Sequence, residues 1–219
     1  MNKYNNMIVQ KPWGSEYIIY DNGTVAITLM SIDFSQSTSL HCHPTKKTGF
    51  ILVSGTAEIT LGFYNCEIFS APSKTVIRPG FFHSTKAISE NGVKVLELEC
   101  PIDKDDIVRF KDKYGREGEN YKSDSKMSSL NNSNILFEEP EINKPKTYNF
   151  DGIEVKLEKS NNLEILSNKS LDTIIGILDG GIRCKKSKKR VLTPGEVIKT
   201  GTIIKLSESF EVDDMITTL

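Results

Sequence analysis

Ser39-Leu40-His41-Cys42-His43 and Arg78-Pro79-Gly80-Phe81-Phe82-His83 are two short stretches that contain all three histidines of this 219-residue chain. Each stretch lies beside an alternating run of β-branched residues, so each is expected at the end of a β-strand. Residues two apart in a strand point to the same side. His41 and His43 should therefore face one way, and His83 can reach the same face from a neighbouring strand.

Three imidazoles on one face predict a divalent metal site with His41, His43 and His83 as ligands. Neutral imidazole is the commonest protein ligand for first-row metals, and three protein ligands leave coordination positions open. Zinc, manganese, iron and nickel all fit such a set. The alternative is three unrelated histidines, but it would have to explain the H-x-H pair, the P-G-x-x-H turn and the lack of any other histidine.

The residues around these histidines resemble the two motifs of the cupin superfamily, in TSLHCHPTKKTGFILVSGTAEI (38–59) and IRPGFFH (77–83). Three further segments, KPWGSEY (11–17), VSGTAEIT (53–60) and DDIVRFKDKYGR (105–116), are similar to the C-terminal cupin domain of the type II mannose-6-phosphate isomerase / mannose-1-phosphate guanylyltransferase family. The resemblance implies a jelly-roll barrel, a bound metal ion, a sugar phosphate or nucleotide sugar as substrate, and a homodimer that pairs through edge strands.

Composition excludes several other classes of function. The formal net charge is −1, so no overall field favours nucleic acid or a membrane surface. The polar N-terminus does not resemble a signal peptide, and no run approaches the ~20 apolar residues of a membrane span. The four cysteines are far apart in the sequence, which favours reduced thiols in a cytoplasmic protein.

Short strands separated by Gly and Pro, with almost no helical periodicity, predict an all-β fold of the double-stranded β-helix type. We expect a metal-binding barrel over 1–114, a linker rich in Gly, Lys, Ser and Asn over 115–140, and a second β domain over 141–219. The linker is expected to contribute little to a core.

The last part of the chain repeats the first, which predicts a bicupin. Ile175–Gly180 aligns with Phe50–Gly55, and Val197–Ile204 with Val76–His83. The positions of the three histidines are then occupied by Leu166, Asn168 and Ile204. The second half should therefore be degenerate, without metal ligands. The alternative is that any two β-meanders would align this well.

The resemblance also implies a carboxylate ligand shortly after H-x-H, but the matching residue here is Thr48. Candidate catalytic bases are Glu97 and Glu99, if their face of the strand points into the barrel, and Lys47 with its neighbour Lys46, if desolvated. The alternative for the glutamates is a solvated outer face, because the intervening leucines look more like core. The alternative for the lysines is an exposed loop.

Binding of a sugar phosphate requires cations, for which the candidates are Arg109, Arg116, Arg78 and Lys86. Each could instead form a surface ion pair. Three functions remain open: a metal-dependent isomerase or epimerase-like enzyme of surface-polysaccharide assembly, a non-haem iron dioxygenase with three histidine ligands, and a non-catalytic sugar-binding cupin.

Overall fold

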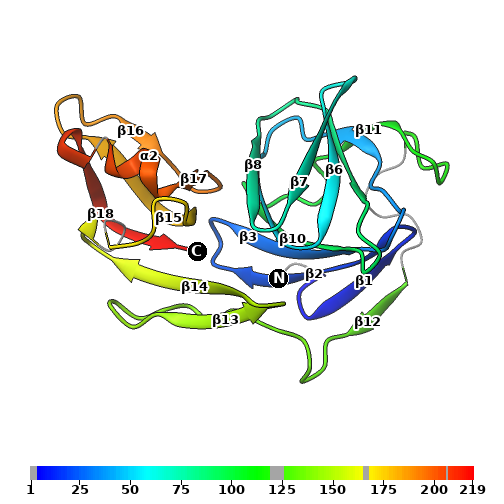
Figure 1. Cartoon of the computed structure of the whole chain (residues 1–219), viewed down its shortest axis with the longest axis horizontal. Helices are drawn as coiled ribbons and strands as arrows, with labels where there is room; N and C mark the ends of the chain where they lie inside the picture. The colour runs from blue at the N-terminus through cyan, green and yellow to red at the C-terminus, as the bar shows by residue number, and fades with distance from the viewer. Residues whose placement is uncertain (1–3, 119–125, 165–167, 206) are drawn as a thin grey trace.

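The computed structural model describes residues 4–118, 126–164, 168–205 and 207–219 (Figure 1). The first half of the chain forms two antiparallel sheets that face each other as a barrel. The larger sheet contains, in spatial order, β12 (Met127–Ser129), β1 (Met7–Lys11), β2 (Gly14–Asp21), β3 (Ala26–Ile32), β10 (Val93–Cys100), β5 (Lys47–Ser54) and β8 (Ser73–Ile77). The smaller sheet contains β11 (Val108–Lys111), β4 (Leu40–Cys42), β9 (His83–Ala87), β6 (Thr56–Leu61) and β7 (Asn65–Ser70).

The barrel interior is filled by alternate side chains from both sheets. Alternation follows from the two-residue period of a strand, which sends Val93 and Val95 of β10 inward and Leu96 outward. Burial of each such side chain stabilises the fold by roughly 1.5–3 kcal/mol. The buried members of this inner core are Trp13, Met30, Ile32, Phe50, Leu52, Ala57, Ile59, Ile77, Ala87, Val93 and Val95.

The second half repeats the strand order of the larger sheet. It contains β13 (Lys146–Phe150), β14 (Ile153–Ser160), β15 (Ile174–Cys184), β16 (Arg190–Leu192), β17 (Val197–Lys199) and β18 (Phe210–Thr218), with α2 (Thr200–Ile204) and a 3-10 turn, η1 (Ser207–Ser209). Its pairing β13-β14-β18-β15-β17 corresponds to β2-β3-β10-β5-β8 of the barrel. The predicted all-β cupin fold with a second, cupin-like half is therefore confirmed.

The proposed alignment does not hold at the end of the repeat. Ile204, aligned with His83, lies in helix α2 rather than in a strand, so the described residues of the second half contain no counterpart of β9. Leu166 lies outside the described residues. Asn168 is described and lies in a turn before β15.

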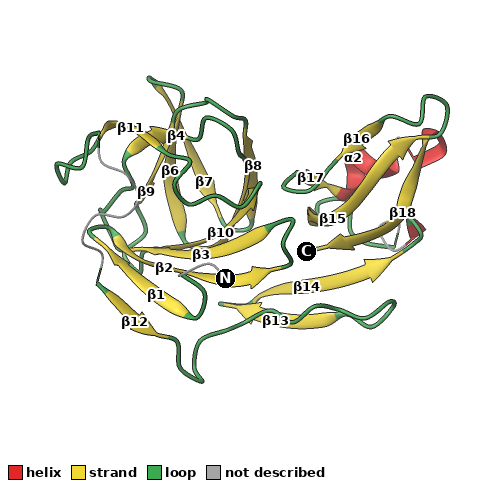
Figure 2. Ribbon diagram, turned by 180° about the vertical axis from the view of Figure 1, so that it is seen from behind, coloured by secondary structure: helices red, strands yellow, loops and turns green. Residues whose placement is uncertain are grey.

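A second apolar core joins the two halves. It combines outward side chains of the barrel, such as Leu96 and Leu98, with Leu157, Leu178 and Val197 of the second half. Figure 2 shows β13 and β14 extending from the second half towards β2 and β3. The outer face of the larger sheet is therefore an interior surface, covered by the same chain.

Two glycines permit this close approach. A Cβ atom on Gly176 would lie 2.7 Å from Leu98 Cδ2, and one on Gly49 would lie 2.5 Å from Val197 Cγ2. Both distances are shorter than a van der Waals contact, so a larger residue would push the halves apart.

Part of the predicted linker contributes to the structure, contrary to expectation. β12 pairs with β1, and Phe137 is buried in the core between the halves, where its N–H donates to the carbonyl of Ile19 at 2.8 Å. Among the described residues, no helix is long and apolar enough to cross a membrane. All four cysteines are free thiols.

Candidate metal centre

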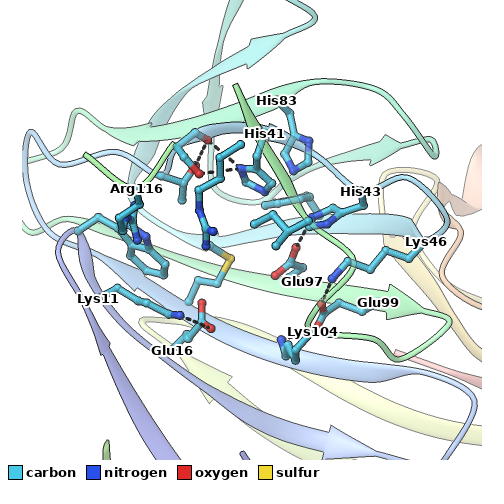
Figure 3. Close-up of a pocket in the computed structure, with 17 residues that line it drawn as sticks. Lys11, Glu16, His41, His43, Lys46, His83, Glu97, Glu99, Lys104 and Arg116 are labelled. Carbon is cyan, nitrogen blue, oxygen red and sulfur yellow. Dashed lines mark hydrogen bonds and ion pairs between the residues drawn. The ribbon is translucent and has the colours of Figure 1, made fainter. Parts of the chain in front are cut away.

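The three histidines meet inside the barrel, on the smaller sheet. His41, the middle residue of β4, pairs directly with His83, the first residue of β9, and His43 follows β4 by one residue. All three are buried, and their ring centroids lie 4.4, 4.9 and 5.3 Å apart. Figure 3 shows the rings gathered at one side of a cavity.

Backbone carbonyls fix the protonation of each ring. The Nδ1 atoms lie 2.8 Å from the Ser39 oxygen for His41, 2.6 Å from the Asp106 oxygen for His43, and 3.2 Å from the Phe81 oxygen for His83. A carbonyl oxygen can only accept, so Nδ1 carries the proton and donates it. The Nε2 lone pair is left available in all three rings, as metal ligation requires.

The remaining nitrogens fit a divalent ion. Within the described part of the chain, Nε2 of His43 and Nε2 of His83 are buried without a hydrogen-bond partner. The three candidate ligand atoms lie within 4.8 Å of one another. A point equidistant from three atoms at that spacing is about 2.8 Å from each, so an ion would draw them in by less than ~1 Å to reach normal Zn–N distances. The histidine cluster could therefore hold a metal ion.

Burial keeps these imidazoles neutral. It lowers the pKa of His43 to about 2, with a further contribution from Lys46, and the pKa of His83 to about 4. Burial, followed by the neighbouring imidazoles, lowers the pKa of His41 well below its usual value. The ligands thus need not lose a proton before an ion binds.

Glu97 and Glu99 of β10 point into the same cavity but have different environments. Glu97 Oε1 lies 3.9 Å from His43 Nε2, and burial together with the nearby Glu99 raises the pKa of Glu97 to about 7. Glu99 accepts hydrogen bonds from Thr28 Oγ1 at 2.9 Å, Lys46 Nζ at 2.5 Å and Lys104 Nζ. Burial alone would raise the pKa of Glu99, but Lys104 and Lys46 outweigh it and lower that pKa.

The solvated-face alternative for the two glutamates does not hold, because both faces of β10 are covered. Leu96 and Leu98 contact the second half, and the alternate positions 97 and 99 point to the barrel interior. The alternation of residues in β10 did not show which face points into the barrel. In an isolated barrel the face with Leu96 and Leu98 would be exposed, but here the second half covers it.

The cavity beside the histidines has a volume of about 60 Å³ and an excess of positive charge. It is lined by five cationic side chains and three carboxylates: Lys11, Lys46, Lys104, Arg109 and Arg116, and Glu16, Glu97 and Glu99. This balance favours an anionic ligand. Of the predicted substrate-binding residues, Arg109 and Arg116 line this cavity.

Three predicted site residues do not line it. Lys47 follows the inward-pointing Lys46 and so points the other way, where its Nζ binds Glu196 at 3.1 Å. Arg78 is mostly exposed and binds the same carboxylate at 2.6 Å. Lys86 is exposed on the outer face of the smaller sheet, in register with Glu58.

Several residues around the cavity were not predicted. Lys104 and Glu16 line it, and the Asp106 carboxylate accepts the backbone N–H groups of Thr45 and Lys46, which positions the loop after His43. The segments 11–17 and 105–116, which resemble the family, contain Lys11, Glu16 and Asp106. That resemblance could have indicated these residues as part of the site. Thr48 is buried with an unpaired hydroxyl among the described residues, so no carboxylate occupies the usual position.

A barrel of two antiparallel sheets, with an H-x-H pair at the end of one strand and a third histidine paired with the first of them from the adjacent strand, is typical of a cupin. The family described as mannose-6-phosphate isomerase C-terminal matches residues 2–112, which is half of the chain. The chain therefore belongs to this family.

The curated relatives include proteins of polysaccharide biosynthesis. The alginate biosynthesis protein AlgA of Pseudomonas putida is 29% identical over 114 residues, and the xanthan biosynthesis protein XanB of Xanthomonas campestris pv. campestris is 30% identical over 110 residues. These matches cover 51% and 49% of this chain but 23% of each relative. The match thus spans about a quarter of the length of those proteins.

Solved structures with a similar fold include oxalate decarboxylase from Lactobacillus farciminis and the capsular polysaccharide assembling protein CapF from Staphylococcus aureus. The first has a TM-score of 0.42 at 19% identity and covers 47% of this chain and 33% of that one. The second has a TM-score of 0.43 at 16% identity and covers 48% and 34%.

Proposed function

We propose that this chain is a metal-dependent cupin isomerase, or an epimerase-like enzyme, acting on a phosphorylated or nucleotide-linked sugar in surface-polysaccharide biosynthesis. Two arguments support the substrate class. The chain belongs to the mannose-6-phosphate isomerase C-terminal family, and AlgA and XanB are named for polysaccharide biosynthesis. The cavity has more cations than carboxylates, as an anionic sugar derivative requires.

The observation that carries the proposal is the position of Glu97. Its carboxyl is buried in the cavity, 3.9 Å from Nε2 of His43. A carboxyl beside a metal site is the arrangement needed by a base that acts on a polarised sugar. Glu97 would lie close to the carbon atoms of a sugar whose oxygens face the histidine cluster.

In this proposal His41, His43 and His83 would hold a divalent ion through Nε2, and such an ion would supply Lewis-acid polarisation of a carbonyl or hydroxyl oxygen. Glu97 takes the proton from one carbon and returns it to the adjacent carbon. A second proton moves from the hydroxyl on one carbon to the oxygen of the other, so the aldose and ketose contain the same atoms. Electrons remain balanced, and no redox partner is needed.

The other polar residues position these groups. Glu99, held by two lysines and Thr28, stays ionised and fixes Lys46 and Lys104 rather than acting as the base. Arg109 and Arg116 both line the cavity and are the candidate phosphate ligands in this proposal; Arg116 also makes two 2.8 Å contacts with Asp112. Lys47, Arg78 and Lys86 lie outside the cavity lining and have no role in this proposal.

The size of the cavity limits what enters it. The cavity volume of about 60 Å³ leaves room for only a small group of atoms beside the histidines. The reacting end of a sugar therefore fits beside the histidines, and the phosphate or nucleotide extends towards Arg109.

The test is a coupled isomerase assay on protein loaded separately with zinc, manganese, iron or nickel. Mannose 6-phosphate, fructose 6-phosphate and GDP-mannose are the first substrates, with His43→Ala as the inactive control. In parallel, a ligand at ~100 times its dissociation constant should stabilise the fold by about 2.7 kcal/mol in a thermal-shift screen. The proposal fails if no metal form shows turnover and no sugar shifts the melting temperature.

One observation favours a second candidate, a three-histidine iron dioxygenase. The ligand set contains no carboxylate, since Thr48 stands where the family-like motif would supply one. Iron that copurifies with the chain and supports oxygen uptake would favour this candidate. Stabilisation by sugars without any turnover would instead favour the non-catalytic sugar-binding cupin.

A further inference from the structure

A second cavity lies between the two halves of the chain, on the other side of the larger sheet from the metal centre. Its volume is about 470 Å³, against about 60 Å³ for the cavity beside the histidines. Ile51 and Val53 of β5 form its wall on the barrel side, whereas Phe50 of the same strand lines the metal cavity. Alternation along β5 therefore separates the two cavities by one strand. We call the larger space the inter-half cavity.

The walls of the inter-half cavity are mostly apolar. Eight of its fourteen described lining residues are aliphatic or proline: Ile51, Val53, Pro72, Ile153, Val155, Ile174, Ile175 and Leu219. The cavity continues the apolar core between the halves, which contains Ile51, Val155 and Leu219. Glu154 and Asp172 at its border are exposed, so a ligand can enter from solvent. Apolar walls with a few polar groups, placed between two structural units, are the usual setting of a small-molecule site.

The border of the inter-half cavity favours an uncharged ligand. Its described charged residues are two lysines and two carboxylates, so their charges cancel. Each is already paired: Lys156 with Glu154 at 2.8 Å, Asp172 with Lys199 at 2.8 Å, and Lys169 with Glu158. A charged ligand would lose its hydration there without gaining a free counter-charge. The metal cavity differs, because its five cations outnumber its three carboxylates.

We propose that the inter-half cavity binds an uncharged small molecule with an apolar body and one hydrogen-bonding group, of which a medium-chain alcohol is the simplest example. Its volume falls within the ~300–1,000 Å³ of small-molecule sites, and apolar cavities of ~150 Å³ already bind benzene. The hydroxyl of Thr173, which lines the cavity, can donate to the polar group or accept from it. Binding here is independent of the metal centre and of the proposed isomerase activity.

The apolar walls predict how affinity depends on the ligand. Each methylene group that leaves water for the cavity should tighten binding about fourfold, which corresponds to ~0.8 kcal/mol. 1-Octanol should therefore bind roughly 15-fold more tightly than 1-hexanol. Octanoate and octylammonium have a similar chain but a charged end, and each should bind at least ~10-fold more weakly than 1-octanol.

The experiment uses the full chain and the uncharged fluorescent probe N-phenyl-1-naphthylamine, which the alcohols and their charged analogues then displace. Ile174→Trp and Ile153→Trp should each weaken probe binding at least ~10-fold, because the indole ring occupies the cavity. Both isoleucines are half-buried, so folding should persist, as circular dichroism can verify. The matched control is Ile198→Trp, since Ile198 is also half-buried but lines a separate apolar cavity of about 160 Å³. His43→Ala should bind the probe like the wild type, which separates this site from the metal centre.

Several results would overturn the proposal. One is a wild-type chain that does not bind the probe, and another is a loss in Ile198→Trp or His43→Ala as large as that in Ile174→Trp. The same holds for Phe110→Asp, because Phe110 and Phe63 form an exposed aromatic contact at which the probe could bind instead. Octanoate or octylammonium that displaces the probe as well as 1-octanol would exclude an uncharged ligand as the preferred class.

Discussion

Replacement of Glu99 by Gln should destabilise the fold far more than loss of an ordinary ion pair. Glu99 is almost fully buried and is the shared acceptor of Lys46, Lys104 and Thr28. Glutamine has the same shape but no charge, so two lysines would be left in the barrel without their counter-ion. Removal of one partner from a buried pair typically costs 3–5 kcal/mol, which is a large fraction of the 5–15 kcal/mol that stabilises most domains.

We therefore expect Glu99→Gln to reduce the free energy of unfolding by about 4 kcal/mol. For a chain of this size that corresponds to a decrease of roughly 8–16 °C in melting temperature. The assay is urea denaturation at pH 7, supported by calorimetry. The matched control is Glu154→Gln, which removes a Glu–Lys pair of 2.8 Å that is largely exposed, and it should cost less than ~1 kcal/mol.

The pH dependence gives an independent check of this reasoning. The pKa of Glu99 is lower in the folded state than in the unfolded chain, so its ionisation stabilises the fold above the unfolded pKa. This stabilisation is lost as the pH falls through the folded pKa. The difference between wild type and Glu99→Gln should thus shrink below about pH 4.5. A cost for Glu99→Gln as small as that of Glu154→Gln would refute the role of the buried charges.

The remaining predictions concern the cavity and the apolar core between the two halves. His43→Ala should lose most bound metal, measured by elemental analysis after dialysis, while the barrel stays folded; full occupancy would show that the ligand assignment is wrong. Glu97→Gln should lower kcat by about 10²–10⁴ with metal affinity nearly unchanged, and an unaltered kcat would exclude it as the base. Arg109→Ala should weaken sugar-phosphate binding in calorimetric titration, whereas Arg78→Ala should not, because Arg78 lies outside the cavity; equal effects would contradict this division. Gly176→Ala should destabilise the fold by about 1–3 kcal/mol in thermal melts, since its Cβ would meet Leu98, and an unchanged melting temperature would contradict the close packing.

The sequence was sufficient to predict the barrel and the meeting of the histidines, because both depend on local rules. The two-residue period of a strand places His41 on the inner face. A Pro-Gly turn precedes His83, which begins the adjacent strand and pairs directly with His41. The repeat of the strand order was also predictable from short apolar runs separated by turns. Its end was not, because residues 200–204 form a helix that the strand-like pattern did not indicate.

Residues that depend on long-range packing could not be assigned from the sequence. Whether Lys46 or Lys47 points inward depends on the register of β5 with its neighbours, and either choice was consistent with the pattern. Lys104 follows β10 in a segment without periodicity, so its contact with Glu99 emerges only from the folded chain. Glu97 was ambiguous because the covering of the opposite face of β10 comes from residues beyond 140.

The core shared by the two halves makes the barrel that contains the histidine cluster dependent on the C-terminal half of the chain. A protein truncated after residue 114 would leave Leu96 and Leu98 in water, on the strand that positions Glu97 and Glu99. Loss of that contact would remove the packing on the outer face of β10. Glu97 and Glu99 on its inner face would then be less well positioned, although no residue of the cavity had been changed. The degenerate half is thus a structural support for the site, and heat should melt both halves in one cooperative transition.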